Sequence, residues 1–238
     1  MERSFSAKDD ARRTVWDALK KEKVARFPFP PHGRIPNFKD AEKAAERLFG
    51  SALWKNVEQI KANPDAPQRP VRERALRECI TVYMPTPRLK GGFKKIDPSD
   101  IPGDSLGDAA TLTKSDRWAE TVALSDLPEM DLVVCGSVAV TKEGRRAGKG
   151  EGYSDLEYAI LKELGHPDVP VVTTVHDLQV VDKIPVDEHD IPLTLIATPT
   201  GLVRVKDPPE PPKGIDWSLL SEKDLDEMPV LKELQKSA

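Results

Sequence analysis

Apolar residues recur at helical spacing in two stretches near the start of the chain. The stretch from Lys8 to Val24 predicts an amphipathic helix that Ser6 could cap. A second helix is predicted after Asn37, which would cap it, and Gly50 is a natural stop. The apolar face of the first helix consists of Ala11, Val15, Ala18 and Leu19, and that of the second consists of Ala41, Ala44, Ala45, Leu48 and Phe49.

The pattern then changes to short apolar runs separated by turn signals. Strands are predicted at Asn56 to Lys61 and at Ile80 to Met84, on either side of a helix from Val71 to Glu78 that Pro70 introduces. This order is a βαβ unit, for which two parallel strands joined by a right-handed crossover are expected.

A further apolar block, Leu132 to Cys135, is nearly continuous, as is typical of a central strand buried on both faces of a parallel sheet. A helix from Asp155 to Leu164, ended by Gly165, and three more strands are predicted after it. Those strands span Val169 to Val175, Leu193 to Ala197 and Leu202 to Val205. The sequence therefore predicts an α/β protein with an open, mostly parallel sheet and helices on both faces.

Two regions lack this pattern. The stretch from Pro85 to Glu129 has little apolar periodicity and carries a basic glycine turn, Lys90 to Lys95, so a long irregular surface excursion is expected. Residues 207–238 open with a proline-rich linker and continue with Trp217 and several leucines. We expect an α/β domain over residues 1–206 and a C-terminal arm over 207–238 that packs back on it.

Composition narrows the functional classes. The 238 residues carry a formal net charge of −4, which does not favour wholesale nucleic-acid binding. The two cysteines, Cys79 and Cys135, indicate reduced thiols and not a disulfide framework. No apolar stretch is long enough to span a bilayer, and residues 1–8 lack a signal-peptide core, so no membrane partner and a cytoplasmic location are expected. Monomer and homodimer both remain open.

The candidate chemistry lies in a glycine-rich loop, Gly144 to Tyr153, between the buried strand and the following helix. Its glycines let the backbone approach an anion closely, and the start of the helix adds unpaired N–H groups. Arg145, Arg146 and Lys149 supply positive charge for phosphates. The spacing fits neither the Walker A motif nor the dinucleotide fingerprint, and the alternative interpretation is a flexible basic turn.

Residues 144–155 resemble the pattern Gly-Arg-Arg-Leu-Gly-x-Gly-x-Gly-Tyr-Tyr-Asp-Arg of the 5-formyltetrahydrofolate cyclo-ligase family, which is Rossmann-like in fold. Lys8 and Arg12 are similar to the family's phosphate-contacting pair, and Ile184 to Asp190 resembles its downstream block. The chain is still more similar to the branch of methenyltetrahydrofolate synthetase domain-containing proteins. The segments that carry this second resemblance are Phe27 to Lys39, Pro85 to Leu89, Gly148 to Tyr158 and Val175 to Asp177.

The resemblance implies a ligase of one-carbon folate metabolism that uses ATP and Mg²⁺ to convert 5-formyltetrahydrofolate into 5,10-methenyltetrahydrofolate. It implies catalytic roles for Arg145, Lys149 and Tyr153, and a Mg²⁺ ligand in Asp155. The implied ATP-binding residues are Lys8, Arg12, Arg145, Arg146, Gly148, Lys149, Gly150 and Gly152. The substrate, a reduced folate or a related small molecule, would contact Asp65, Gln68, Tyr153 and His176.

The sequence departs from the family at two functional positions. The family's pterin-binding glutamate falls at Pro67-Gln68, and its second Mg²⁺-coordinating acid falls near Thr194. Nucleotide binding therefore carries over better than folate binding, although Asp65 could replace the missing glutamate. The alternative function is a nucleotide-binding paralog with an altered substrate, in folate- or thiamine-related metabolism, or with no catalytic activity. For His176-Asp177, a functional pair and a simple strand-ending turn are both open.

Overall fold

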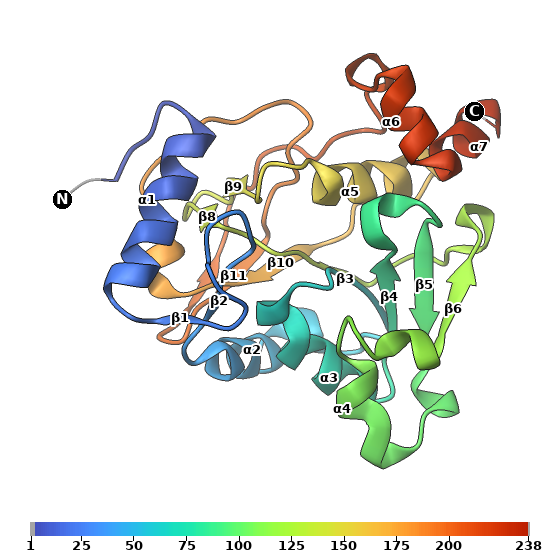
Figure 1. Ribbon diagram of the computed structural model, residues 1–238, viewed down its shortest axis with the longest axis horizontal. Coiled ribbons are helices and arrows are strands. Elements are labelled where there is room, and N and C mark those ends of the chain that lie inside the picture. The colour runs from blue at the N-terminus through green and yellow to red at the C-terminus, as the bar shows by residue number, and fades with distance from the viewer. Residues whose placement is uncertain (1–2, 238) are drawn as a thin grey trace.

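A computed structural model describes residues 3–237 (Figure 1). Within them, one mixed sheet runs in the order β12-β11-β10-β7-β3-β4-β5-β6. Its strands are β3 (Gln59–Ala62), β4 (Thr81–Pro85), β5 (Phe93–Ile96), β6 (Ala119–Val122), β7 (Leu132–Val134), β10 (Val171–Thr174), β11 (Leu195–Ala197) and β12 (Leu202–Arg204).

The strands β11, β10, β7, β3 and β4 are parallel to one another, and antiparallel strands extend the sheet on both sides of them. The predicted mostly parallel α/β sheet is confirmed, with β7 in its centre. The βαβ unit is confirmed as well, because β3 and β4 pair in parallel and are joined by α3 (Arg69–Arg77), whose first turn contains Pro70.

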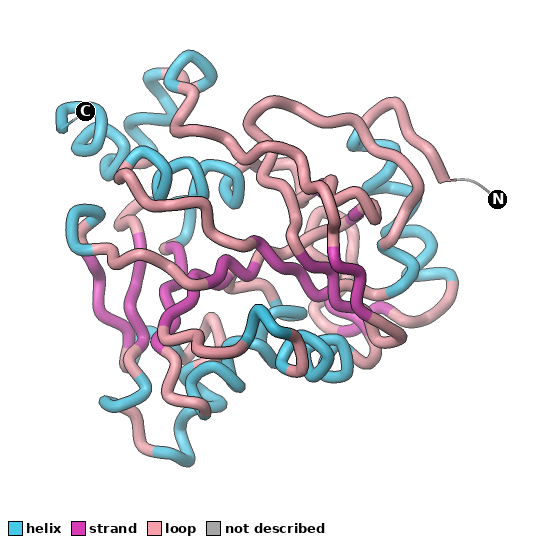
Figure 2. Tube along the Cα trace, turned by 180° about the vertical axis from the view of Figure 1, so that it is seen from behind, coloured by secondary structure: helices cyan, strands magenta, loops and turns pink. Residues whose placement is uncertain are grey.

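Helices cover both faces of the sheet (Figures 1 and 2). On one face lie α2 (Ala41–Phe49), α3 and the short α4 (Leu106–Ala109). On the other face lies α5 (Tyr153–Glu163) with the C-terminal helices α6 (Glu222–Glu227) and α7 (Pro229–Ser237). The central strand β7 contributes side chains to the core on each face of the sheet. Leu132 and Val134 point to one face and Val133 points to the other, and all three are fully buried.

The first helix, α1 (Lys8–Lys21), packs on a third cluster beside a small hairpin of β8 (Ala139–Val140) and β9 (Arg146–Ala147). A second small sheet pairs β1 (Ala25–Arg26) with β2 (Asn37–Phe38). In the C-terminal arm, Leu231 is fully buried and joins the core cluster that contains Tyr158 of α5. None of the described helices has the length and apolar content that a membrane crossing requires.

Three sequence expectations were wrong. The region from Pro85 to Glu129 is not an irregular excursion, because β5 and β6 extend the sheet there; the basic glycine turn links β4 to β5, with Phe93 fully buried. The expected caps also differ. Ala7, and not Ser6, precedes α1, and Asp40 in a left-handed conformation precedes α2, because Asn37 is taken into β2.

Candidate functional site

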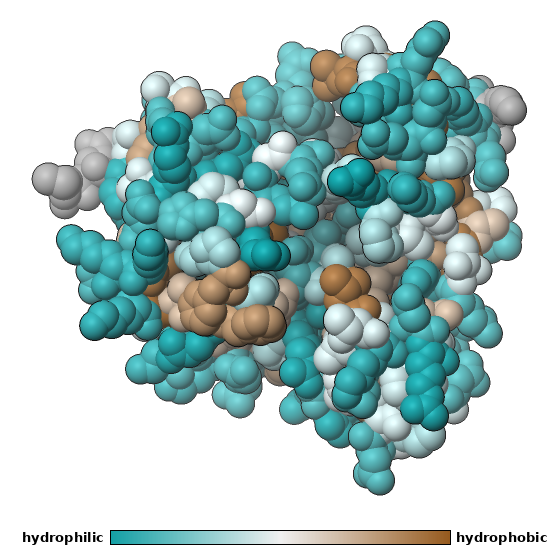
Figure 3. Space-filling view, viewed as in Figure 1, coloured by the Kyte–Doolittle hydropathy of each residue, from teal (hydrophilic) through white to brown (hydrophobic). Residues whose placement is uncertain are grey.

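A cavity of about 1100 Å³ lies at the carboxyl ends of the parallel strands. Its walls are the segment after β3, the segment after β4, the start of α1 and the glycine-rich loop with the first turn of α5. In the space-filling view a hollow lies near the middle of a mostly hydrophilic face, beside an apolar patch over the chain between β1 and β2 (Figure 3). Open α/β sheets bind ligands at this edge.

The glycine-rich loop is a hairpin turn followed by a bend into α5. Gly150 has φ of 106° and Gly152, at the N-cap of α5, has φ of 72°, conformations that favour glycine. The bend brings Tyr153, Ser154 and Asp155 of the first helical turn to the cavity wall. The N–H groups at the start of α5 therefore lie beside the space that an anion would enter.

Two cations of α1 contact segments far along the chain, Lys8 the segment after Ile184 and Arg12 the glycine-rich loop. Lys8 Nζ lies 2.6 Å from Asp187 Oδ2 and 2.5 Å from Asp190 Oδ2. Arg12 Nε donates to the carbonyl oxygen of Gly148 at 2.8 Å. The fold thus joins the N-terminal helix, the glycine-rich loop and the segment after Ile184, although they are far apart in the sequence.

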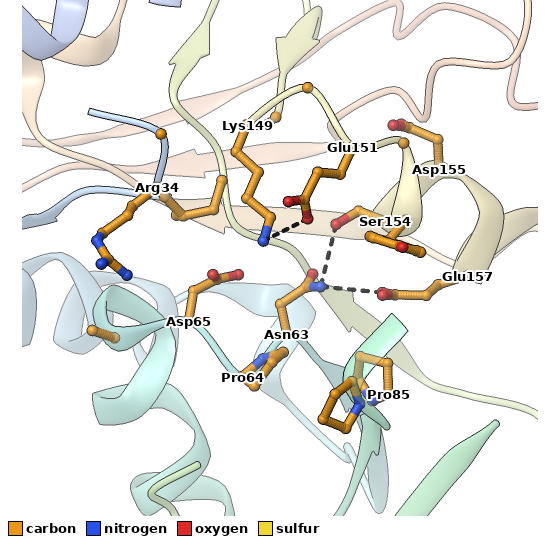
Figure 4. Close-up of a pocket in the computed structure, with 18 of the residues that line it drawn as sticks. Arg34, Asn63, Pro64, Asp65, Pro85, Lys149, Glu151, Ser154, Asp155 and Glu157 are labelled. Atoms are coloured by element: carbon orange, nitrogen blue, oxygen red, sulfur yellow. Dashed lines mark hydrogen bonds and ion pairs between the residues drawn. The ribbon is translucent and has the colours of Figure 1, made fainter. Parts of the chain in front are cut away.

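Two cations of the loop itself, Arg146 and Lys149, line the cavity. Arg146 lines the cavity with a side chain only 2% exposed, and its Nη2 lies 3.5 Å from Asp155 Oδ1. Its Nε has no hydrogen-bond partner among the described residues. Lys149 projects into the cavity and pairs with Glu151 at 2.7 Å (Figure 4). One wall of the cavity thus carries a guanidinium and an ammonium group, the two cations that recognise phosphates in proteins, each paired with a carboxylate.

Asp65 faces this wall from the segment after β3. Its carboxylate and Lys149 point toward each other across the cavity (Figure 4). Burial raises the pKa of Asp65 above its ordinary value, while the charges of Lys149, Arg72 and Lys61 oppose that shift. A carboxylate in such a place can accept hydrogen bonds from a ligand's amino or ring N–H groups.

Beneath the cavity lies a buried polar cluster that the sequence analysis missed. Asn63 donates from Nδ2 to Ser154 Oγ at 3.2 Å and to Glu157 Oε2 at 3.1 Å (Figure 4). Glu157 in turn forms an ion pair with Lys61, which is fully buried on β3. The sequence signal that could have revealed this cluster is a charged residue at a position expected to be buried, which occurs at Lys61 in a strand and at Glu157 in a helix.

Arg72 fixes the segment that carries Asn63 and Asp65. This buried side chain donates to the carbonyl oxygens of Pro64 and Asp65, both at 3.1 Å, and of Ala110 at 2.9 Å, and also to that of Asn63. Burial is the largest influence on its guanidinium and lowers its pKa to about 10, so the side chain stays charged at neutral pH.

The structure does not bring all the sequence-predicted residues into the cavity. The side chains of Arg145, Gln68 and His176 are absent from its lining. Gln68 is fully buried and turns toward β10, where Nε2 donates to Thr174 Oγ1 at 3.2 Å. His176 caps the short helix Asp177–Gln179, because its Nδ1 accepts from Leu178 N–H at 3.1 Å.

Thr194 also lies away from the cavity. It precedes β11, and its hydroxyl accepts from Val171 N–H at the amino ends of the strands. The remaining predicted residues do line the cavity: Lys8, Arg12, Asp65, Arg146, Gly148, Lys149, Gly150, Gly152, Tyr153 and Asp155.

The carboxylates around Lys8 suit a hard cation. Asp155, Asp187 and Asp190 all line the cavity, and the ligand atoms of Asp187, His189 and Asp190 lie within 4.8 Å of one another. Oxygen ligands of this kind are those that Mg²⁺ prefers. Lys8 Nζ lies within ion-pair distance of both Asp187 and Asp190, so a metal could bind these carboxylates only if Lys8 turned away from them.

A parallel α/β sheet whose carboxyl edge carries a basic glycine-rich loop ahead of a helix defines the class of α/β proteins with a ligand cavity at that edge, an arrangement suited to anions. The comparison with known families makes this class specific. The model of the 5-formyltetrahydrofolate cyclo-ligase family matches residues 6–199. The chain therefore belongs to the 5-formyltetrahydrofolate cyclo-ligase family.

Similar proteins agree with this assignment. The chain is 43% identical over 98% of its length to the methenyltetrahydrofolate synthase domain-containing protein of Bos taurus, and 44% identical over 97% to that of Mus musculus. It spans only about 63% of the length of either relative. The NMR structure of Aquifex aeolicus 5,10-methenyltetrahydrofolate synthetase covers 84% of the chain, and the match covers 93% of that structure, with a TM-score of 0.52 and 19% identity. That likeness confirms the fold.

Proposed function

We propose that this protein binds Mg-ATP at the glycine-rich loop and is a ligase of the cyclo-ligase type, acting on 5-formyltetrahydrofolate or a closely related compound. The observation that carries this proposal is the meeting of Lys8, Arg12, Arg146 and Lys149 around one cavity at the carboxyl edge of the sheet. These four cations come from two separate parts of the chain, α1 and the glycine-rich loop, and they suit the charge of a nucleotide triphosphate.

In the proposed reaction, the formyl oxygen of 5-formyltetrahydrofolate attacks the γ-phosphorus of ATP, and ADP leaves. N10 then attacks the activated formyl carbon, the C–O bond to phosphate breaks, and N10 loses its proton. The products are 5,10-methenyltetrahydrofolate, ADP and phosphate. Such chemistry asks a protein mainly to position two substrates and to neutralise charge.

The residues of the cavity can divide this work. Lys149 and Arg146 would hold phosphate oxygens on the loop side, and Lys8 and Arg12 would hold them from α1. Asp155 would hold Mg²⁺, which supplies further neutralisation of the phosphate charge. Tyr153 lines the cavity at the start of α5, where its ring can contact the substrate beside the reacting phosphate.

The residues after β3, at the end of the cavity that Asp65 lines, support a proposal that the substrate preference is altered. Gln68 is turned into the protein, and Asp65, three residues earlier, is the carboxylate that reaches the cavity. If Asp65 takes the place of the family's pterin-binding glutamate, the carboxylate meets the ligand from a shifted position. We therefore propose ATP binding together with weak or absent turnover of 5-formyltetrahydrofolate itself.

A steady-state assay tests the two parts separately. Protein, Mg-ATP and 5-formyltetrahydrofolate are mixed, the methenyl product is followed by its absorbance, and nucleotide affinity is measured by calorimetry. We expect measurable ATP binding and slow turnover that Asp65→Asn lowers further. Efficient turnover that is unaffected by Asp65→Asn would show that the proposal about the folate site is wrong. Absence of ATP binding would refute the proposal about the nucleotide.

A further inference from the structure

The turn after β4 holds a residue in a conformation that its side chain does not favour. Arg88 has φ of 53° and ψ of 30°, and Leu89 after it has φ of 52°. Two successive left-handed residues that are not glycine are uncommon, because the Cβ of each crowds its own backbone. Such strain persists only where the surroundings impose it, and it is concentrated at functional sites.

The surroundings do impose it. Thr86 N–H donates to the carbonyl oxygen of Gly92 at 2.9 Å, Leu89 N–H donates to that of Thr86 at 2.9 Å, and Gly91 N–H donates to Thr86 Oγ1 at 2.9 Å. The side chain of Leu89 is 1% exposed and belongs to the core cluster. The turn is thus anchored on both sides of Arg88.

The anchored turn presents Arg88 to the ligand space. Arg88 lines the cavity and is exposed, and its charge lies close enough to the Tyr153 hydroxyl to oppose the rise in its pKa that burial causes. Its guanidinium has no hydrogen bond or ion pair with another described residue, whereas Lys8, Arg12, Arg146 and Lys149 each have a partner. Arg34 also lines the cavity, and its guanidinium has no such partner among residues 3–237, but its backbone is not left-handed.

We propose that Arg88 is a ligand-binding residue that grips an oxyanion of the ligand from the β4 side of the cavity, facing the glycine-rich loop. The planar fork of an arginine matches a phosphate or a carboxylate, and either group would complete its hydrogen bonds. The strained turn orients this fork before the ligand arrives. This inference rests on the proposed function only in that the cavity binds an anionic ligand.

The test separates binding from stability. In Arg88→Asn the charge is lost, and asparagine tolerates the left-handed conformation well, so the variant should bind less tightly without losing stability. Arg88→Lys keeps the charge without the fork. Lys90→Asn is the matched control, because Lys90 is exposed on the same turn, outside the cavity lining, with φ of −57°.

Calorimetry uses three probes: Mg-ATP, inorganic tripolyphosphate and 5-formyltetrahydrofolate. Arg88→Asn should weaken at least one of them about tenfold, with an intermediate loss in Arg88→Lys and none in Lys90→Asn. The midpoint of thermal unfolding should stay unchanged or rise by up to about 4 °C. Loss with both phosphate probes identifies a phosphate, and loss with the folate alone identifies a carboxylate.

Wild-type affinity of Arg88→Asn for all three probes would overturn the inference, and so would a fall of several degrees in its unfolding midpoint, which would make Arg88 a structural residue. If the wild type binds tripolyphosphate or the folate through Arg88 but does not bind Mg-ATP, the proposed function fails and this inference stands. A wild type that binds none of the probes overturns both.

Discussion

Lys61 on β3 and Glu157 on α5 form an ion pair with side chains that are 0% and 3% exposed. Burial raises the pKa of Glu157, and Lys61 beside it opposes that rise. The pair therefore joins the sheet to the helix below the cavity, and each charge depends on the other for its compensation.

We predict that breaking this pair from one side is worse than removing it. Lys61→Met should lower the free energy of unfolding by about 3 to 5 kcal/mol, because Glu157 then remains buried without a cation. The double variant Lys61→Met, Glu157→Leu should be more stable than Lys61→Met. Urea unfolding of the two single variants and the double variant measures the coupling, and strictly additive losses would contradict it.

A second prediction concerns the glycine-rich loop. Lys149→Ala should weaken Mg-ATP binding by about 1.5 to 3 kcal/mol, tenfold or more, because a charge-assisted phosphate contact is lost. Arg145→Ala is the comparison variant. The sequence alone assigns Arg145 the same role, but its side chain is absent from the cavity lining, so we expect little change. Equal losses in both variants, measured by calorimetry, would show that the loop rearranges around the nucleotide.

Asp65 gives a prediction with a definite pH dependence. Burial raises the pKa of Asp65 above the ordinary value of 3.8, so the folded protein holds this proton more tightly than the unfolded chain does. The stability gained from this tighter proton binding is present below the pKa that Asp65 has in the unfolded chain. It is lost as the pH rises through the pKa that Asp65 has in the folded protein. Asp65→Asn should therefore be the more stable protein near pH 7, and its advantage should shrink toward pH 4. Urea titrations across that range would contradict this if the difference stayed constant.

The fourth prediction concerns the C-terminal arm. Leu231 is fully buried in the core cluster that contains Tyr158, so Leu231→Ala should lower the free energy of unfolding by about 2 to 5 kcal/mol. Leu219→Ala, at a side chain that is 58% exposed, should change it by less than about 0.5 kcal/mol. Separate unfolding transitions for the arm and the sheet would show that the arm is not part of one cooperative unit.

Much of the fold could be predicted because its inner strands are buried on both faces. Leu132 to Val134 is apolar throughout, and the helices between the strands have clear apolar stripes. Strands β5 and β6, of which β6 forms the edge of the sheet, escaped prediction because they carry polar residues such as Lys94, Lys95 and Glu120, which look like loop residues in the sequence.

The part of the candidate site that is contiguous in the sequence could be predicted. The parts that depend on the direction of individual side chains could not. The loop from Gly148 to Gly152 lies between a strand and a helix in the sequence and in the structure. Gln68 and Asp65 are three residues apart, but the short helix Ala66–Gln68 turns the first into the core and leaves the second at the cavity. Spacing alone cannot distinguish these two directions.

Helix α5 is in contact with a different part of the protein at each end. Its first turn forms the cavity wall with Tyr153 and Asp155, and Glu163 in its last turn accepts from Ile215 N–H at 3.0 Å and from Trp217 Nε1 at 3.4 Å. Between these two ends, Ser154 and Glu157 hold the helix to Asn63 and Lys61 beneath the cavity. The C-terminal arm and the cavity are thus in contact with opposite ends of the same helix.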